Sequence, residues 1–296
     1  MSWDEYQVMT SVEETIERLM EYQGRARVVA GGTDLVIQMR EEGDGKGAIL
    51  LDITQIRETR GIAESEGFLW VGAATTMAEI AASPLVWKKA RAFAQGARWL
   101  GSPQIRNVAT VGGNVVNAQP AADTTIPLIA LRAEARILSG QGERFEAVER
   151  LFEGVGKSTV DPHRELIASF RIPLCEGPRR ASAMERLARR KAFTLPTLSV
   201  AISMELDEAG DHFSWARIVA APVGPIPWRA RRAEESLYRG AVTPESVAKA
   251  AALAREDANP RESLRGGADY RKEMVEVLVR RAFGQALSFL GREGYG

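Results

Sequence analysis

The sequence predicts an α+β fold made of at least two parts. Helix and strand patterns alternate over about the first 55 residues, which is typical of a small α/β unit. In the last third of the chain, strand patterns come before helix patterns, which is typical of an antiparallel sheet covered by helices. The chain has 296 residues, and at roughly 150 residues per domain this length corresponds to about two domains.

The first element is a helix expected at residues 11–23. Ser11 and Glu14 have the spacing of a capping box, in which each side chain bonds to the backbone amide of the other residue. An apolar stripe follows at helical spacing, formed by Val12, Ile16, Leu19 and Met20. The next elements expected are a strand at 27–30, a glycine-rich turn at 31–34, a helical segment from Leu35 and a buried strand at 48–53.

The remaining elements follow from the same patterns. In the middle of the chain we expect a strand at 68–72, a helix from Thr75 or Thr76 to Ala82, a break at Ser83-Pro84 and a helix at 85–97. Shorter elements are expected as far as about residue 173, followed by a linker at 175–180. The last third is expected to hold strands at 182–190, 198–206 and 215–221, then helices at 228–238, 244–256 and 267–289.

Charge and cysteine content exclude several function classes. The chain has 39 Lys and Arg against 39 Asp and Glu, so it has no overall field to attract nucleic acid or an anionic membrane. Cys175 is the single cysteine, which excludes an internal disulfide and argues against an iron–sulfur cluster or a structural zinc site. The N-terminus lacks a signal-peptide pattern and no apolar run reaches the length of a membrane span, so a cytoplasmic location is expected.

Two glycine pairs are the most informative features. Ala30-Gly31-Gly32-Thr33-Asp34 follows an expected strand, and Thr110-Val111-Gly112-Gly113-Asn114 has the same form. Glycine permits a positive φ and lets a ligand approach the backbone, and successive amides in such turns form an anion-binding nest. A helix start adds further free N–H donors. Each pair alone is equally well explained as a simple turn, but the two together predict a pyrophosphate site.

Other motifs carry weaker predictions. Neither glycine pair has the G-x-G-x-x-G spacing of a Rossmann fingerprint. Gly154-Val155-Gly156-Lys157-Ser158-Thr159 ends like a P-loop, but Leu151 stands where that motif requires its first glycine, so a solvent-facing loop is expected. Basic runs at 186–191 and 229–232 are expected to be solvated faces, or to meet an acidic partner or a second phosphate. No catalytic or metal-binding residue is predicted, and loop positions are expected for the two histidines, His163 and His212.

Several motifs occur in the order found in one known family. They are Ala30-Gly31-Gly32-Thr33-Asp34-Leu35, Gly72-Ala73-Ala74-Thr75-Thr76, Gln104-Ile105-Arg106-Asn107-Val108-Ala109-Thr110-Val111-Gly112-Gly113-Asn114 and Ala118-Gln119-Pro120-Ala121-Ala122-Asp123. The match extends through Arg171-Ile172-Pro173, Pro225-Ile226-Pro227-Trp228-Arg229-Ala230 and Asp269-Tyr270-Arg271. In these motifs the chain resembles, over essentially its whole length, the FAD-binding medium subunit of the molybdenum hydroxylases, the xanthine dehydrogenase and carbon monoxide dehydrogenase family.

The resemblance implies a fold and a set of FAD-binding residues. The fold is an FAD-binding domain of the PCMH or vanillyl-alcohol-oxidase type at 1–175, with α/β subdomains at about 1–55 and 56–175, then a C-terminal α+β domain at 180–290 of the CO dehydrogenase flavoprotein type. Both glycine turns would wrap the pyrophosphate, Asp123 would lie near the ribityl or ribose hydroxyls, and two apolar residues would lie near the isoalloxazine. The residues implied are Arg27, Val28, Val29, Ala30, Gly31, Gly32, Thr33, Asp34, Leu35, Leu100, Thr110, Val111, Gly112, Gly113, Asn114, Asp123 and Ile167.

In one segment the chain departs from this family. Relatives often carry an acidic residue followed by a small one after the position of Arg190, where this chain has Lys191-Ala192-Phe193-Thr194-Leu195-Pro196-Thr197. No flavin contact is therefore carried over to the segment 191–197.

The resemblance also implies a redox role and partner subunits. The chain would be an oxidoreductase subunit that takes electrons from an iron–sulfur small subunit and passes them to NAD+ or another acceptor. A large subunit would carry the molybdopterin, in a dimer of heterotrimers, and a xanthine dehydrogenase-like enzyme is favoured. Two alternatives are a self-contained flavin oxidase of the same fold and an assembly or binding protein that holds no flavin.

Overall fold

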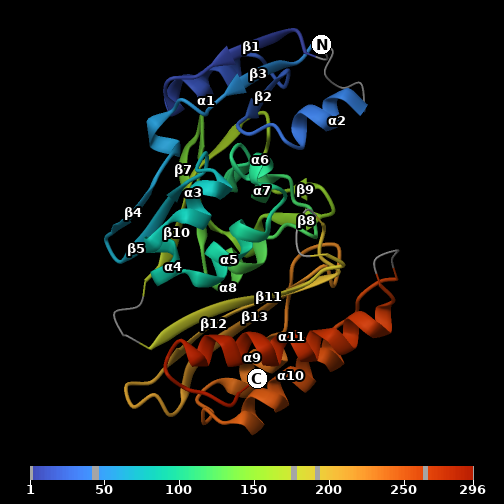
Figure 1. Ribbon diagram of the computed structural model, residues 1–296. Coiled ribbons are helices and arrows are strands. Elements are labelled where there is room, and N and C mark those ends of the chain that lie inside the picture. The colour runs from blue at the N-terminus through green and yellow to red at the C-terminus, as the bar shows by residue number, and fades with distance from the viewer. Residues whose placement is uncertain (1–2, 42–46, 175–178, 191–193, 263–265, 296) are drawn as a thin grey trace.

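The computed structural model describes residues 3–41, 47–174, 179–190, 194–262 and 266–295. The single cysteine, Cys175, and residues 191–193 of the segment that departs from the family pattern lie outside these ranges. The chain forms a stack of three sheets with their helices, in which the N-terminal elements lie at one end and helices α9 to α11 at the other (Figure 1).

The first sheet is parallel and has three strands in the order β1-β3-β2. Strand β3 (Ile49–Asp52) lies between β1 (Glu5–Val8) and β2 (Ala26–Val29). Helix α1 (Val12–Glu21) packs on one face through Val12, Ile16 and Leu19, and α2 (Leu35–Glu41) buries Met39 against the other. The sequence patterns predicted β2, β3 and both helices but not β1, which is a mostly exposed strand of four residues at the edge of the sheet.

Helix α1 begins as predicted, with one difference in its cap. The Ser11 side chain accepts a hydrogen bond from the Glu14 amide at 3.1 Å. The Glu14 carboxylate accepts from the amide and hydroxyl of Thr10 instead of from the Ser11 amide, so the reciprocal bond of a capping box is displaced by one residue. The prediction that Met20 belongs to the buried stripe is wrong, because this side chain lies at the edge of the helix face and is 58 % exposed.

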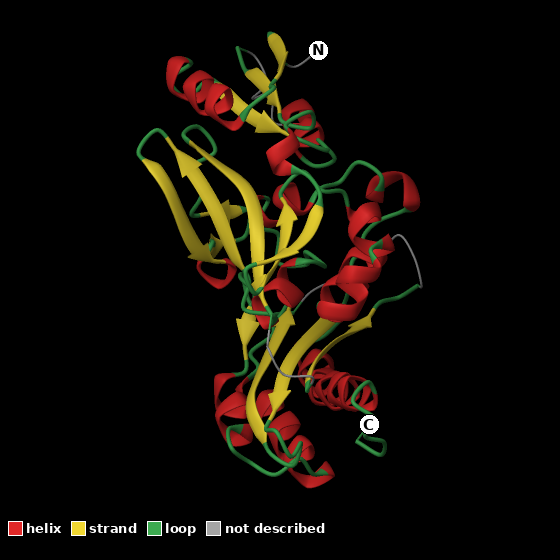
Figure 2. Cartoon of the chain, turned by 90° about the vertical axis from the view of Figure 1, so that its left-hand side faces the viewer, coloured by secondary structure: helices red, strands yellow, loops and turns green. Residues whose placement is uncertain are grey.

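The second sheet is antiparallel, with the strand order β4-β5-β10-β6-β7. It lies between α1 and the C-terminal sheet (Figure 2). Its inner face packs on α3, α5, α7 and α8 in the largest apolar core of the chain. The bounds are β4 (Ile62–Ser65), β5 (Phe68–Gly72), β6 (Glu134–Ser139), β7 (Gly142–Ala147), β10 (Glu165–Pro173), α3 (Met77–Ala82), α5 (Arg91–Trp99), α7 (Val111–Val116) and α8 (Thr125–Ala130), with short helices η1 (Arg57–Thr59), α6 (Pro103–Arg106) and η2 (Val148–Arg150).

The helix expected at 85–97 is two helices. Ser83 caps α4 (Pro84–Lys89) by accepting from the Val86 amide at 3.3 Å, so Ser83-Pro84 starts this helix as well as ending α3. Ala90 has φ −145° and ψ 54°, outside the helical region, and separates α4 from α5. The apolar spacing continues across this break, which is why the pattern alone predicted one helix.

The third sheet forms the C-terminal part of the chain, with the strand order β11-β12-β13-β14. One face is covered by α9, α10 and α11, and the other packs against α5 and α8. The predicted helix at 228–238 is wrong at its start, because Trp228–Arg229 pairs with β13 as a short strand. The bounds are β11 (Arg180–Leu187), β12 (Leu198–Leu206), β13 (Phe213–Ala221), β14 (Trp228–Arg229), α9 (Arg231–Leu237), α10 (Pro244–Asp257) and α11 (Ala268–Ser288). A search of the described residues finds no helix with the length and hydropathy of a membrane span.

A charged cluster joins the C-terminal sheet to η2. Glu149 accepts hydrogen bonds from Arg229 at 2.8 Å and from Arg231 at 2.6 Å. Glu234, which is 8 % exposed, bonds Arg229 and accepts from the Ile218 amide. Burial, together with the neighbouring Arg229, lowers the pKa of Arg217 to about 10. The expectation of a solvated face is therefore wrong for Arg229, which meets acidic partners inside the protein, whereas the side chains of Arg231 and Arg232 are 67 % and 51 % exposed.

We expect Glu149→Gln to lower the free energy of unfolding by about 1–2 kcal/mol. The change removes the negative charge that Arg217, Arg229 and Arg231 share in a half-buried place, and hydrogen bonds to charged groups are worth more than neutral ones. Glu256→Gln is the matched control, because Glu256 pairs with Arg232 where both side chains are more than half exposed. It should change stability by less than about 0.5 kcal/mol. Urea denaturation measures both, and equal effects would contradict the role assigned to Glu149.

Candidate cofactor-binding site

The first glycine turn lies between β2 and α2, at the carboxyl end of the parallel sheet. Ligands of open α/β sheets bind at this edge. Gly32 has φ +63°, which glycine adopts without strain. Within the described ranges, no protein acceptor bonds the backbone amides of residues 31–34. These consecutive donors form a place where an anion can bind.

The second glycine turn uses its amides inside the protein. Thr110 caps α7 by accepting from the Gly113 amide at 3.3 Å, and the Asn114 amide bonds the Thr110 carbonyl at 3.0 Å. The Val111 amide donates to Thr75 at 3.1 Å and the Gly112 amide to Ala73 at 2.8 Å. The two turns are alike in sequence. The expectation that both provide backbone amides for an anion agrees with the structure only at the first turn.

The two turns are held together by close backbone contacts. A Cβ added at Gly31 would lie 2.1 Å from the carbonyl oxygen of Val108, just before the second turn. A Cβ at Gly112 would lie 2.8 Å from the Cβ of Ala73. The side chains of Gln38 and Asn117 add a hydrogen bond of 3.2 Å between α2 and the end of α7. Both glycines are thus required by packing of the chain on itself, in addition to any ligand.

Gly113 and Asn114 follow Gly112 in the second turn and are exposed and half-buried, respectively. Gly113 is exposed at the start of α7, where its missing side chain leaves room close to the helix backbone. The side-chain Oδ1 of Asn114 accepts from the Thr124 hydroxyl at 2.5 Å, which links the second turn to the start of α8. The next residue before this helix is Asp123, so the chain brings a carboxylate to the same region.

Asp123 is almost completely buried, with 6 % of the residue exposed. Its Oδ1 lies 3.2 Å from Nε of Arg186 on β11, whose side chain is 4 % exposed. No well-aligned hydrogen bond to Oδ1 is formed in the part of the chain that the structure describes. Burial raises the pKa of Asp123 to about 6, and the charge of Arg186 opposes this shift. A buried carboxylate with a free lone pair is suited to accept hydrogen bonds from a polyhydroxylated ligand.

The remaining predicted residues lie at different depths. Arg27 and Val28 are half-buried on β2, whereas Val29 is buried against α2. Leu100 is half-buried at the end of α5, and its carbonyl accepts from Arg106 at 2.9 Å. Ile167 is 4 % exposed in the core of the second sheet, beside a bulge in the pairing of β10 with β6. The contacts of Leu100 and Ile167 with the flavin stay predictions.

The motifs set aside in the sequence have structural explanations. The segment that resembles a P-loop forms a hairpin of β8 (Phe152–Gly154) and β9 (Lys157–Ser158). His163 bonds the Ala26 carbonyl at 3.0 Å through Nδ1, which fastens the turn before β10 to the first sheet. His212 is exposed and bonds Asp207, as expected of a loop histidine.

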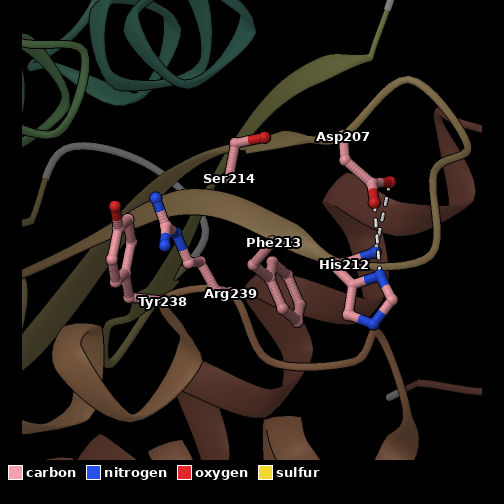
Figure 3. Close-up of a pocket in the computed structure, with 6 residues that line it drawn as sticks. All are labelled: Asp207, His212, Phe213, Ser214, Tyr238 and Arg239. Atoms are coloured by element: carbon pink, nitrogen blue, oxygen red, sulfur yellow. Dashed lines mark hydrogen bonds and ion pairs between the residues drawn. The ribbon is translucent and has the colours of Figure 1, made fainter.

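A cavity of about 450 Å³ lies beside His212, away from the glycine turns. Its lining residues come from the ends of β12 and β13 and from the end of α9, and they are Asp207, His212, Phe213, Ser214, Tyr238 and Arg239 (Figure 3). None of these described residues belongs to the predicted FAD site.

Sequence reasoning missed two features of the site. Arg186 was assigned to a basic run, and nothing in the sequence pairs it with a carboxylate 63 positions away. Ala118, which follows α7, has φ +47°, and its carbonyl accepts from the Gly156 amide at 3.0 Å. An alanine gives no signal of a left-handed backbone. The alternation of β11 could have shown that Arg186 shares a face with the buried Met184, and so points inward.

The first glycine turn, with its cluster of amides outside the carboxyl end of a parallel sheet, is an arrangement typical of proteins that bind nucleotides. Comparison with known families then identifies the class: the chain belongs to the family described as "FAD binding domain in molybdopterin dehydrogenase", which matches residues 3–175. Residues 184–286 match the "CO dehydrogenase flavoprotein C-terminal domain". The predicted family, fold class, FAD cofactor and oxidoreductase class are confirmed.

Individual relatives come from several enzymes. The chain is 30 % identical to the carbon monoxide dehydrogenase medium chain of Hydrogenophaga pseudoflava, over 95 % of this chain and 96 % of that one. It is 29 % identical to a putative xanthine dehydrogenase FAD-binding subunit of Escherichia coli, over 90 % of each chain. A solved structure of the H. pseudoflava carbon monoxide dehydrogenase matches with a TM-score of 0.88 over 97 % of this chain and 98 % of that chain, at 30 % identity.

We expect Gly31→Ala to destabilise the protein by at least about 2 kcal/mol. The new methyl group would overlap the Val108 carbonyl, and overpacking against backbone cannot be relieved by a side-chain rotation. Gly154→Ala is the matched control, because its added Cβ would come no closer than 3.9 Å to its neighbours and the residue has no positive φ. The control should change the free energy of unfolding by less than about 0.5 kcal/mol. Similar values for the two variants would refute the contact between the turns.

Proposed function

We propose that this chain is the FAD-binding electron-transfer subunit of a multi-subunit molybdenum hydroxylase, which receives electrons from an iron–sulfur subunit and passes them to NAD+ or another acceptor. The observation that carries the proposal is the run of amides at residues 31–34, which no acceptor among the described residues bonds, beside the exposed start of α7 and the buried Asp123. Medium-chain relatives that match along most of both chains support it.

The residues of the chain would bind and orient the cofactor. The amides of the first turn would hold the pyrophosphate, and Gly113 and Asn114 would border it from the second turn. Asp123 would accept hydrogen bonds from sugar hydroxyls. FAD, when bound, supplies the one- and two-electron redox chemistry, so this chain needs no acid–base residue of its own.

The partners and boundaries are part of the proposal. We propose an iron–sulfur small subunit and a molybdopterin large subunit in a dimer of heterotrimers, and domains at 1–175 and 180–290, which the separate family matches support. Relatives named for xanthine, nicotinate and carbon monoxide dehydrogenases have nearly equal identity to this chain, 29 %, 28 % and 30 %. The substrate of the holoenzyme therefore stays unassigned.

We expect the isolated full chain to bind FAD and to oxidise no substrate by itself. The amide cluster and Asp123 are in place without a partner, whereas the described residues show no acid–base pair among the predicted site residues. Reconstitution with FAD, followed by gel filtration and the flavin absorbance spectrum, measures binding. Reduced, FAD-loaded chain mixed with NAD+, a quinone or oxygen then shows which acceptor reoxidises it fastest.

Two results would overturn the proposal. A chain that shows no flavin absorbance after reconstitution would favour an assembly or binding protein. A chain that oxidises an organic substrate without other subunits would favour a self-contained flavin oxidase.

A further inference from the structure

Asp123 and Arg186 meet across the boundary between the FAD-binding part and the C-terminal sheet. Asp123 precedes α8, which packs on β12 and β13 of the C-terminal sheet, and Arg186 lies on the neighbouring strand β11 of that sheet. Their side chains are 6 % and 4 % exposed, and Oδ1 lies 3.2 Å from Nε. Neither atom completes a well-aligned hydrogen bond within the described residues. Charge and packing hold the two side chains together, and a hydrogen bond from the Arg186 guanidinium to the Thr194 carbonyl also fixes the arginine. Asp123 Oδ1 keeps acceptor capacity for a ligand.

The surroundings of Asp123 are otherwise apolar or neutral. Its backbone carbonyl packs on Gly96 of α5, where an added Cβ would lie 2.4 Å away, and the Met184 sulfur lies beside the same place. Ser199 on β12 is the register partner of Arg186, and its buried hydroxyl also lacks a bond among the described residues. Among the described residues of the elements packed against Asp123, Arg186 is the one charged group whose charge shifts the pKa of this carboxyl.

We propose that Arg186 is a positioning residue for the cofactor, which keeps Asp123 ionised inside the protein so that its carboxylate can accept hydrogen bonds from the hydroxyls of FAD. The inference rests on the proposed function, because it takes FAD as the ligand of this site. It also means that the C-terminal sheet completes the site, since the FAD-binding part alone would bury Asp123 without a counter-charge.

The sign of the pH dependence follows from the environment. Burial raises the pKa of Asp123 to about 6, so the carboxyl is ionised above this pH and protonated below it. A protonated carboxyl loses acceptor strength toward hydroxyls, so FAD should bind more weakly as the pH falls through this range. Removal of the Arg186 charge takes away the interaction that lowers this pKa, so the pKa should rise further.

The test is the dissociation constant of FAD for the full chain between pH 5 and 8.5, measured by flavin fluorescence. We expect wild type to lose affinity below about pH 6. Arg186→Met should have its midpoint shifted upward by about one pH unit, so that it binds FAD about twofold more weakly than wild type at pH 7, nearly tenfold more weakly at pH 5 and like wild type at pH 8.5. Arg186→Lys should resemble wild type. Asp123→Asn should bind weakly at every pH, with no midpoint in this range.

Arg136→Met is the matched control. Arg136 pairs with Glu143 on β7, on the half-exposed side of the second sheet, and should leave both affinity and midpoint unchanged. An Arg186→Met variant that is weaker by the same factor at all pH values would overturn the inference, because a merely structural role has that effect. If this variant does not fold, the profiles of Arg186→Lys and Asp123→Asn decide. A wild type that binds FAD with a flat profile overturns this inference alone, and one that binds no FAD overturns the proposed function as well.

Discussion

The backbone contact between Gly31 and Val108 determines the shape of the site. It places the turn after β2 against the segment that leads into α7, with no room for even a methyl group between them. Gly112 repeats this constraint against Ala73, which fixes α7 on the second sheet. Because a carbonyl oxygen and an alanine Cβ form these contacts, side-chain rotation cannot loosen them. The first sheet and the second sheet are thereby held in one arrangement, and the amides of residues 31–34 lie next to the contact with no acceptor among the described residues.

The two glycine turns have different physical roles in spite of their similar sequences. In the first, a positive φ at Gly32 and a lack of protein acceptors, within the described ranges, leave consecutive N–H groups available. In the second, Thr75, Ala73 and Thr110 already accept the corresponding bonds. A glycine pair in a sequence therefore indicates that another group comes close to the backbone at that turn. Only the hydrogen-bond partners of the amides show whether that group is a ligand or another part of the protein.

The predictable part of the molecule is the part that local patterns control. Apolar spacing and caps predicted α1, α3, α10 and α11 and most strands, and the motifs predicted the family. The patterns failed where tertiary contacts decide: an edge strand at Glu5–Val8, a break at Ala90 inside an unbroken apolar pattern, and strand pairing at Trp228–Arg229. The pairing of Arg186 with Asp123 could not be predicted from local sequence patterns either, because it depends on how the C-terminal sheet packs against the FAD-binding part.

Hydrogen–deuterium exchange of the full chain with and without FAD separates the roles of the two glycine turns. Amides of residues 31–34 are expected to exchange fast in the apoprotein and to become protected when FAD is added, because they gain acceptors only then. Amides of residues 111–114 should be protected in both states, since protein carbonyls and the Thr110 hydroxyl already bond them. Unchanged exchange at 31–34 on addition of saturating FAD, with protection gained at 111–114 instead, would contradict the division of roles between the two turns.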